Sequence, residues 1–186
     1  MNTKYKLLEN DTINHFDITL YRIEAIKDFG SIKTGDRGGY IEHEKNLDTD
    51  SDAWVYDNAW VYDNARVSGN ARVSGNALVY GDARVYGDAR VSGNARVSGD
   101  AWVYGNAEVS GNADLICITN IGSRISTLSI YKTDDDSIAF CTGCFYGTLE
   151  KFISSIQKTH NVNSVHFKNY MAAIEFAKVY FNIQKP

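Results

Sequence analysis

The chain has 186 residues, a net charge of −4, and acidic and basic residues mixed along its length. This balance excludes a polybasic surface of the kind that binds nucleic acid or anionic lipid. No apolar run reaches the ~18 residues of a membrane span, and the start lacks the apolar stretch of an export signal. With three cysteines, too few and odd in number for a disulfide framework, we expect a cytoplasmic protein that does not contact membranes.

Residues 1–46 predict an N-terminal β capping segment. The stretches "YKLL" and "ITLYRIEAIKDFG" suggest strands, and Gly38 and Gly39 suggest a tight turn before a short strand at Tyr40 and Ile41. The segment precedes a repeat array whose open end would be an unpaired sheet edge. We therefore expect it to cover the first coil of that array.

A six-residue repeat dominates residues 47–120. Ten copies of Ala-x-Val-x-Gly/Asp-Asn/Asp run from Ala53 to Asn112, and we interpret "LDTDSD", "ADLICI" and "TNIGSR", up to Arg124, as degenerate copies. Ala and Val stand two apart, so both face the same side of a strand. Both residues of the closing pair can adopt the positive φ of a sharp corner. Each hexad is thus predicted to form a strand and a turn.

The repeat resembles the hexapeptide repeat of left-handed parallel β-helices, in which three hexads complete one triangular coil. The resemblance implies a mainly β fold, a solenoid of about four coils in which residue n lies beside n+18, at the strand spacing of about 4.8 Å. A right-handed coil is the alternative. One expected column consists of asparagines whose amides hydrogen-bond along the stack: Asn58, Asn76, Asn94 and Asn112.

Residues 121–186 predict a C-terminal ββαα capping domain. The stretch "STLSIYKTDDDSIAFCTGCF" suggests a hairpin closed by Asp134–Asp136, which we interpret as a solvated turn rather than a cation site. A helix is expected after Thr148 as its N-cap, and a second after Ser164. Their apolar residues recur at helical spacing: Leu149, Phe152, Ile153 and Ile156 in the first, and Phe167, Tyr170, Met171, Ile174, Ala177 and Phe181 in the second.

The outward positions of the array supply the candidate binding residues: Arg66, Arg84, Tyr86, Trp102, Tyr104, Arg72 and Arg90. Trp, Tyr and Arg are the enriched anchors of protein interfaces. In a competing account the caps cover the aromatic residues, with Trp54, Tyr56, Trp60 and Tyr62 under the N-terminal segment and Trp102 and Tyr104 under the C-terminal one. For the arginines the alternative is a solvated, salt-bridged face. Nucleic acid is disfavoured because residues 53–112 hold five Arg against five Asp and one Glu.

The pair Cys141 and Cys144 is a weak metal candidate. Only Cys117, His160 and His166 are candidates to complete such a site. The favoured interpretation is that the thiols pack as small apolar groups. No metal and no cofactor is expected.

Enzymes with this repeat, acyltransferases and a class of carbonic anhydrases, carry a catalytic or metal-binding histidine near the coil. Here His15, His43, His160 and His166 all lie outside the array, so the resemblance supplies no catalytic residue. We therefore predict a protein that is not an enzyme. A trimeric acyltransferase-like enzyme with its site between subunits is the alternative.

Stretches along nearly the whole chain, "LYRIEAIKDFGSIKTGDRGGYIEHEKNL", "WVYDNA" and "IGSRISTLSIYKT", together resemble a group of uncharacterised hexapeptide-repeat proteins of bacteriophages and prophages. The resemblance implies a phage setting, the host cytoplasm, and a host-directed or anti-defence role. We expect a rigid, homo-oligomeric binding protein that engages a host protein or a small nucleotide ligand. A nucleotide-ligand or nucleic-acid binder is the second alternative.

Overall fold

Each hexad folds as a two-residue strand and a corner, and three hexads make one turn of a parallel β-solenoid. The computed structural model describes residues 2–183. In it, every array strand pairs in parallel with an array strand that lies 18 residues before or after it in the sequence, as in Arg66 beside Arg84. The strands form three faces, β4-β7-β10-β13, β5-β8-β11 and β6-β9-β12. This confirms the predicted solenoid of about four turns. The strands are β4 (Trp54–Val55), β5 (Trp60–Val61), β6 (Arg66–Val67), β7 (Arg72–Val73), β8 (Leu78–Val79), β9 (Arg84–Val85), β10 (Arg90–Val91), β11 (Arg96–Val97), β12 (Trp102–Val103) and β13 (Glu108–Val109).

The interior of the solenoid consists of the alanine and valine columns. All ten repeat alanines and all ten repeat valines are at most 1% exposed. Burial of a valine side chain contributes roughly 1.5–3 kcal/mol. The small alanine leaves room for the chain to turn toward the next face, so the two residue types together fill the tube.

The corners depend on the fifth residue of the hexad alone. Seven of the eight glycines there have φ between 60° and 77°, whereas Gly111, in the last hexad, is extended at −155°. Asp57 and Asp63 have φ of 54° and 57°. The positive φ expected at the closing pair is confirmed at the fifth residue of nine hexads, and no sixth residue adopts it. The asparagine ladder forms in part. Within the described chain, its amides make one hydrogen bond, from Asn76 Nδ2 to Asn94 Oδ1 at 3.4 Å.

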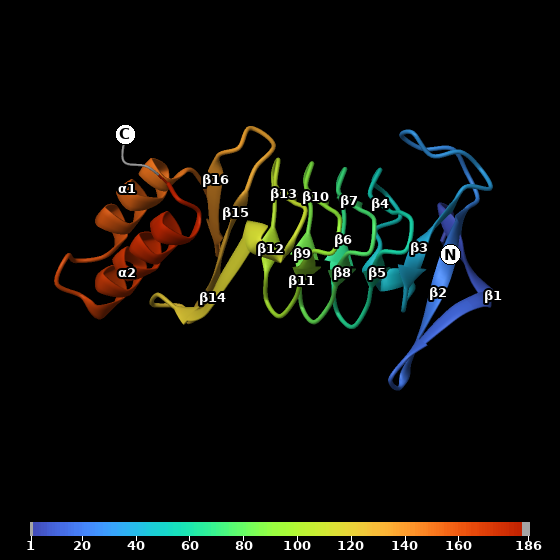
Figure 1. The fold of residues 1–186 in the computed structure, drawn as a ribbon, viewed down its shortest axis with the longest axis horizontal. Helices are drawn as coiled ribbons and strands as arrows, with labels where there is room; N and C mark the ends of the chain where they lie inside the picture. Colours follow the sequence, from blue (N-terminus) through green and yellow to red (C-terminus); the bar gives the residue numbers. More distant parts are fainter. Residues whose placement is uncertain (1, 184–186) are drawn as a thin grey trace.

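The N-terminal segment caps the first coil as an antiparallel sheet that continues into one solenoid face. Strands β1 (Tyr5–His15), β2 (Ile18–Ala25) and β3 (Arg37–Ile41) pair antiparallel, and β3 then pairs in parallel with β5. A short 3₁₀ helix, η1 (Glu44–Asn46), leads into the array. Figure 1 shows this sheet at one end of the rod, with the β1–β2 hairpin extending past the solenoid.

The turn predicted at Gly38 and Gly39 is wrong, because both residues lie inside β3. A Cβ atom on Gly38 would lie 2.5 Å from the carbonyl oxygen of Val55, and one on Gly39 would lie 2.5 Å from that of Ala59. Here glycine is needed for close backbone approach between the cap and the first coil.

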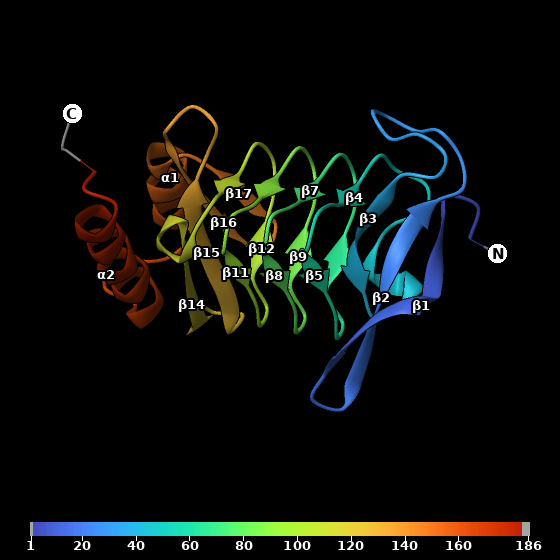
Figure 2. The same ribbon diagram turned by 45° about the vertical axis from the view of Figure 1, so that its right-hand side comes forward.

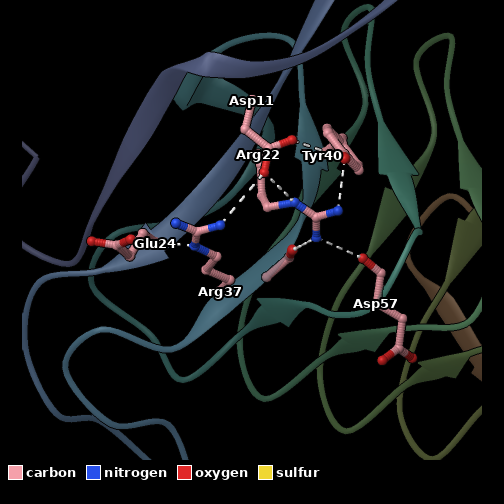
Figure 3. A network of polar contacts seen from close by, with 7 residues as sticks. Asp11, Arg22, Glu24, Arg37, Tyr40 and Asp57 are labelled. Atoms are coloured by element: carbon pink, nitrogen blue, oxygen red, sulfur yellow. Dashed lines mark hydrogen bonds and ion pairs between the residues drawn. The ribbon is translucent and has the colours of Figure 1, made fainter.

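A polar network around Arg22 fastens the cap to the solenoid (Figure 3). The Arg22 guanidinium donates to the carbonyl oxygens of Gly38 (2.7 Å) and Asp57 (3.2 Å) and lies 4.3 Å from the centre of the Tyr40 ring. Its Nε lies 2.9 Å from Oδ2 of Asp11. The other carboxylate oxygen of Asp11, Oδ1, accepts a hydrogen bond from the Tyr40 hydroxyl at 3.1 Å. One side chain thus links β1, β2, β3 and the first corner.

The C-terminal cap is a four-stranded antiparallel sheet covered by two helices. The order is β14-β15-β16-β17, from β14 (Leu115–Ile121), β15 (Ser126–Lys132), β16 (Ile138–Thr142) and β17 (Phe145–Gly147). Figures 1 and 2 show the sheet between the last coil and the helices α1 (Leu149–Thr159) and α2 (Val165–Tyr180). Tyr131 and Cys141 face the solenoid core, whereas Ile130 and Phe140 pack against the helices.

The cap has two more strands than expected, and one of them replaces the predicted end of the array. Strand β14 pairs antiparallel with β15, so "ADLICI" and "TNIGSR" are not degenerate coils. The 3₁₀ helix η2 (Asn112–Asp114) ends the solenoid instead. No helix within residues 2–183 combines the length and apolar character needed to span a membrane.

Candidate functional site

The face β6-β9-β12 brings five of the seven candidate residues together. Arg66, Arg84 and Trp102 lie in register on adjacent strands, and Tyr86 and Tyr104 follow two residues after Arg84 and Trp102. The Arg84 guanidinium carbon is 5.2 Å from the centre of the Trp102 ring, a cation–π contact. The rings of Tyr86 and Tyr104 stack with centroids 4.4 Å apart. The rings of Tyr86 and Trp102 contact each other edge to face. One aromatic and cationic cluster is therefore formed by Arg84, Tyr86, Trp102 and Tyr104.

A hollow lies where this face meets the C-terminal cap, with a volume of about 500 Å³. The solenoid contributes Asp82, Arg84, Asp100 and Trp102 to its walls, and the cap contributes Thr119, Asn120, Ile125, Ser126, Thr127 and Gly143. We call it the Arg84–Trp102 groove. The cap supplies six of its ten lining residues, so the groove is formed between the cap and the solenoid face.

The rim of the groove carries a strained residue. Ile125 has a φ of 51° and is 71% exposed. A β-branched side chain is rarely held in the left-handed region, and such strain clusters at functional sites. Asn120, on the same wall, also has a positive φ, 57°. The two residues flank the β14–β15 turn.

The cap also holds the backbone of two cluster residues, Trp102 and Tyr104. The backbone N–H of Trp102 donates to Ser129 Oγ at 3.0 Å, and that of Tyr104 donates to Tyr131 Oη at 3.1 Å. Burial, with smaller contributions from neighbouring Cys141 and Tyr104, raises the pKa of Tyr86 to about 12, so its phenol stays neutral. These hydrogen bonds hold the backbone of the cluster in place, and the Tyr86 phenol adds no negative charge to it.

The array arginines are exposed and unpaired by carboxylates. Within residues 2–183, none of Arg66, Arg72, Arg84, Arg90 and Arg96 has a carboxylate oxygen within 4.0 Å. The exposure of these arginines agrees with the solvated part of their alternative role, a solvated, salt-bridged face, but the salt bridges expected with it are wrong. Directly stacked like charges are unfavourable without a partner, which makes these arginines available for one.

The remaining two candidates, Arg72 and Arg90, lie on a different face. They are in register on β7 and β10, beside Glu108, and line a hollow of about 280 Å³. Tyr56 and Asp57 close the same hollow. The seven predicted residues thus form two separate groups rather than one site.

The caps cover the aromatic residues of the array to different extents. Trp54 is 1% exposed and packs edge-on against Tyr5 and Phe29, and Tyr62 is 8% exposed beside His15. Covering by the N-terminal segment is confirmed for both. Trp102 stays half-buried and lines the groove, so the C-terminal segment covers it only in part.

Cys141 and Cys144 do not face the same surface, because Cys141 lies in β16 and Cys144 lies in the turn that follows it. Cys141 points into the core, and burial raises the pKa of its thiol to about 11, whereas Cys144 is exposed. Among residues 2–183 no group of three or more His, Cys, Asp or Glu side chains is arranged to hold a metal ion. Asp135 accepts hydrogen bonds from Thr133 and Ser137 within its own turn.

His43 and His160 are the two histidines whose replacement would test the alternative enzyme, and His43 lies at the N-terminal cap. It pairs with Glu42 at 3.2 Å and borders a hollow of about 700 Å³ that also contains Glu9 and Glu44. Three carboxylates around one imidazole make this surface unfavourable for the phosphates of coenzyme A.

The sequence interpretation missed the cap wall of the groove, from Thr119 to Thr127. The repeat pattern predicts residues 119–124 as a degenerate coil, and that prediction obscures their place in the groove wall. The signal that could have identified it is "NIGS", a turn-forming stretch without the Ala-x-Val spacing.

Residues 59–105 match the sequence model of the YdcK β-solenoid repeat, in six overlapping copies that begin at residues 59, 65, 71, 77, 83 and 89. The matched residues are well under half of the chain and lie wholly within the solenoid. Over these residues the array is similar to the YdcK β-solenoid repeat. No curated protein sequence matches the chain.

Proposed function

We propose that this is a non-enzymatic, phage-type binding protein that engages a host protein through the Arg84–Trp102 groove. The observation that carries the proposal is the contact of an exposed, unpaired arginine with a half-open tryptophan at the wall of a concave site. Arg and Trp at the centre of a concave patch are the residue types that dominate binding energy at protein interfaces.

The charges of the groove favour a protein over a nucleotide. Arg84 could contact a phosphate and Trp102 could stack on a base, but Asp82 and Asp100 line the same groove and repel phosphates. A peptide segment carries carboxylates for Arg84 as well as amide and ammonium donors for the two aspartates. The mixed lining fits such a segment.

The setting supports a host-directed or anti-defence role for this binding. It rests on the resemblance of the chain to phage and prophage proteins, and no residue of the groove specifies the partner. The alternative, an acyltransferase-like enzyme, needs a histidine at an acyl-donor site, and the carboxylates around His43 disfavour it.

The test is capture of partners from infected host cells by the wild type and three variants. We expect Trp102→Ala and Arg84→Ala each to weaken binding of the captured protein by at least about 30-fold, as for a hot-spot residue worth about 2 kcal/mol. Arg96→Ala is the matched control, because Arg96 is also exposed but lies on the second face. Equal losses for all three arginine and tryptophan variants would contradict the proposal.

An enzymatic role is tested in parallel by thermal melting with acetyl-coenzyme A. A stabilisation that disappears in His43→Ala would favour the acyltransferase alternative. We expect no shift.

A further inference from the structure

Helix α2 is the outermost element of the C-terminal cap, at the end of the rod opposite the N-terminal sheet (Figure 2). Its inner face packs on the sheet and α1 through Tyr170, Ala173, Ile174 and Ala177, all buried. Its outer face is also apolar: Val165, Phe176, Val179 and Tyr180 are 61%, 52%, 82% and 45% exposed. A helix that is apolar on both faces is usually covered on both.

The outer residues form one stripe with a symmetric order. Val165, Ala172, Phe176 and Val179 recur at intervals of seven, four and three residues, so they share one side of the helix. The stripe reads nearly the same in both directions from Ala172. Val165 and Val179 lie seven residues to either side of it, and Lys168 and Phe176 lie four residues to either side.

We infer that this stripe binds a second copy of the chain, with the two α2 helices antiparallel and crossing at Ala172. Val165 then packs on the partner's Val179, and the aliphatic stem and ammonium of Lys168 cover the partner's Phe176. The small Ala172 at the crossing point lets the helices approach closely. Each contact occurs twice, because a two-fold interface is self-complementary.

The charges of the stripe favour this antiparallel arrangement. Lys168 and Glu175 are both exposed, and antiparallel pairing places each near the opposite charge on the other copy. Glu175 already accepts a hydrogen bond from Lys178 at 2.7 Å, which holds its carboxylate on the helix surface.

The interface is expected to be weak, since one pair of 16-residue helices falls at the small end of protein interfaces, below about 1,200 Å² of total buried area. We expect a dissociation constant in the micromolar range, on the order of 1–100 µM. The groove is not part of this surface, so the inference is independent of the proposed function.

Sedimentation velocity of the full chain from about 1 to 300 µM, a range that brackets micromolar affinity, measures the dimer directly. We expect Phe176→Ser and Val179→Ser each to raise the dimer dissociation constant at least tenfold. Val162→Ser is the matched control, because Val162 is 58% exposed but precedes the helix. It should leave the constant unchanged, as should Trp102→Ala. The inference is overturned if the chain is a monomer at every concentration. It is also overturned if Phe176→Ser and Val179→Ser leave the dimer dissociation constant at the wild-type value.

Cysteine cross-linking tests the register. Ala172→Cys, in a background with Cys117 and Cys144 changed to serine, places the two thiols at the two-fold axis, within the reach of a disulfide. We expect this variant to form a disulfide-linked dimer on mild oxidation and a Lys158→Cys control on α1 to remain monomeric. Equal cross-linking of the two variants refutes the antiparallel register. Binding of α2 to a different host protein would appear as a monomeric chain whose partner capture is lost in Phe176→Ser, which also contradicts the inference.

Discussion

Replacing Gly39 with alanine tests how the N-terminal cap is joined to the solenoid. A Cβ at this position would lie 2.5 Å from the Ala59 carbonyl oxygen, 2.7 Å from Val55 Cγ1 and 2.9 Å from the Tyr56 carbonyl oxygen. Two of the three contacts are backbone atoms, which cannot rotate away. Strand β3 must therefore move outward by roughly half an ångström or more to restore ordinary contact distances.

That movement acts on the bond that holds β3 to the first coil. The backbone N–H of Tyr40 donates to the same Ala59 oxygen at 2.9 Å. Overpacking typically costs about 1–3 kcal/mol, and a weakened backbone hydrogen bond adds about 1 kcal/mol. We expect Gly39→Ala to lower the free energy of unfolding by about 3 kcal/mol, equivalent to about 6–12 °C in Tm for a chain of this size.

The control is Gly99→Ala, which isolates backbone strain. Gly99 has a φ of 61° and no atom within 4 Å of a built Cβ, so alanine there adds only the left-handed penalty of about 1–2 kcal/mol. Urea unfolding followed by tryptophan fluorescence compares the two, because Trp54 is buried between the cap and the first coil. A loss for Gly39→Ala no larger than for Gly99→Ala would refute the close-approach argument.

Three further predictions concern single side chains. Burial lowers the pKa of Lys4 to about 8, so between pH 8 and about 10.5 the unfolded chain binds more protons, and stability from this group rises with pH. The unfolding free energy of the wild type minus that of Lys4→Met should grow across this window in urea titrations, and a flat difference would contradict it. Asp57 has a positive φ, and its carboxylate accepts a 2.9 Å hydrogen bond from the Gly75 N–H. In urea unfolding, Asp57→Gly should lower the free energy of unfolding by no more than about 1 kcal/mol and Asp57→Ala by about 2 kcal/mol. Equal losses for the two variants would refute this account. Iodoacetamide at pH 8 should modify Cys144 and spare Cys141 in the native protein, as read by peptide mass, and protection of Cys144 by Zn²⁺ would restore the metal-site hypothesis.

The solenoid could be predicted because its determinants are local and repeated. The Ala-x-Val spacing defines the inward face of every strand, and the n+18 stacking follows from three hexads per turn, so Arg66, Arg84 and Trp102 could be placed in one column from the sequence. The close approach at Gly38 and Gly39 could not, since it depends on the carbonyl groups of residues that follow later in the chain. A glycine pair by itself predicts a turn more readily than a contact.

The end of the array illustrates the same limit. "ADLICI" keeps the apolar alternation of a strand, and alternation does not distinguish a coil strand from an antiparallel one. The pairing of β14 with β15 decides it, and that pairing needs the hairpin partner, Ser126–Lys132, as well as the sequence of β14 itself. The groove wall at Asn120 and Ile125 was missed for this reason.

Among the hollows of the described chain that contain candidate residues, the largest lies where the repeat ends. There the sheet of the C-terminal cap adds Thr119, Asn120 and Ile125 to the groove on its solenoid side. The same sheet carries α2 on its other side. Pairing of α2 across a two-fold axis would therefore hold two grooves at a fixed separation. A dimeric partner would then bind with an avidity that Phe176→Ser removes, whereas a monomeric partner would bind both forms equally.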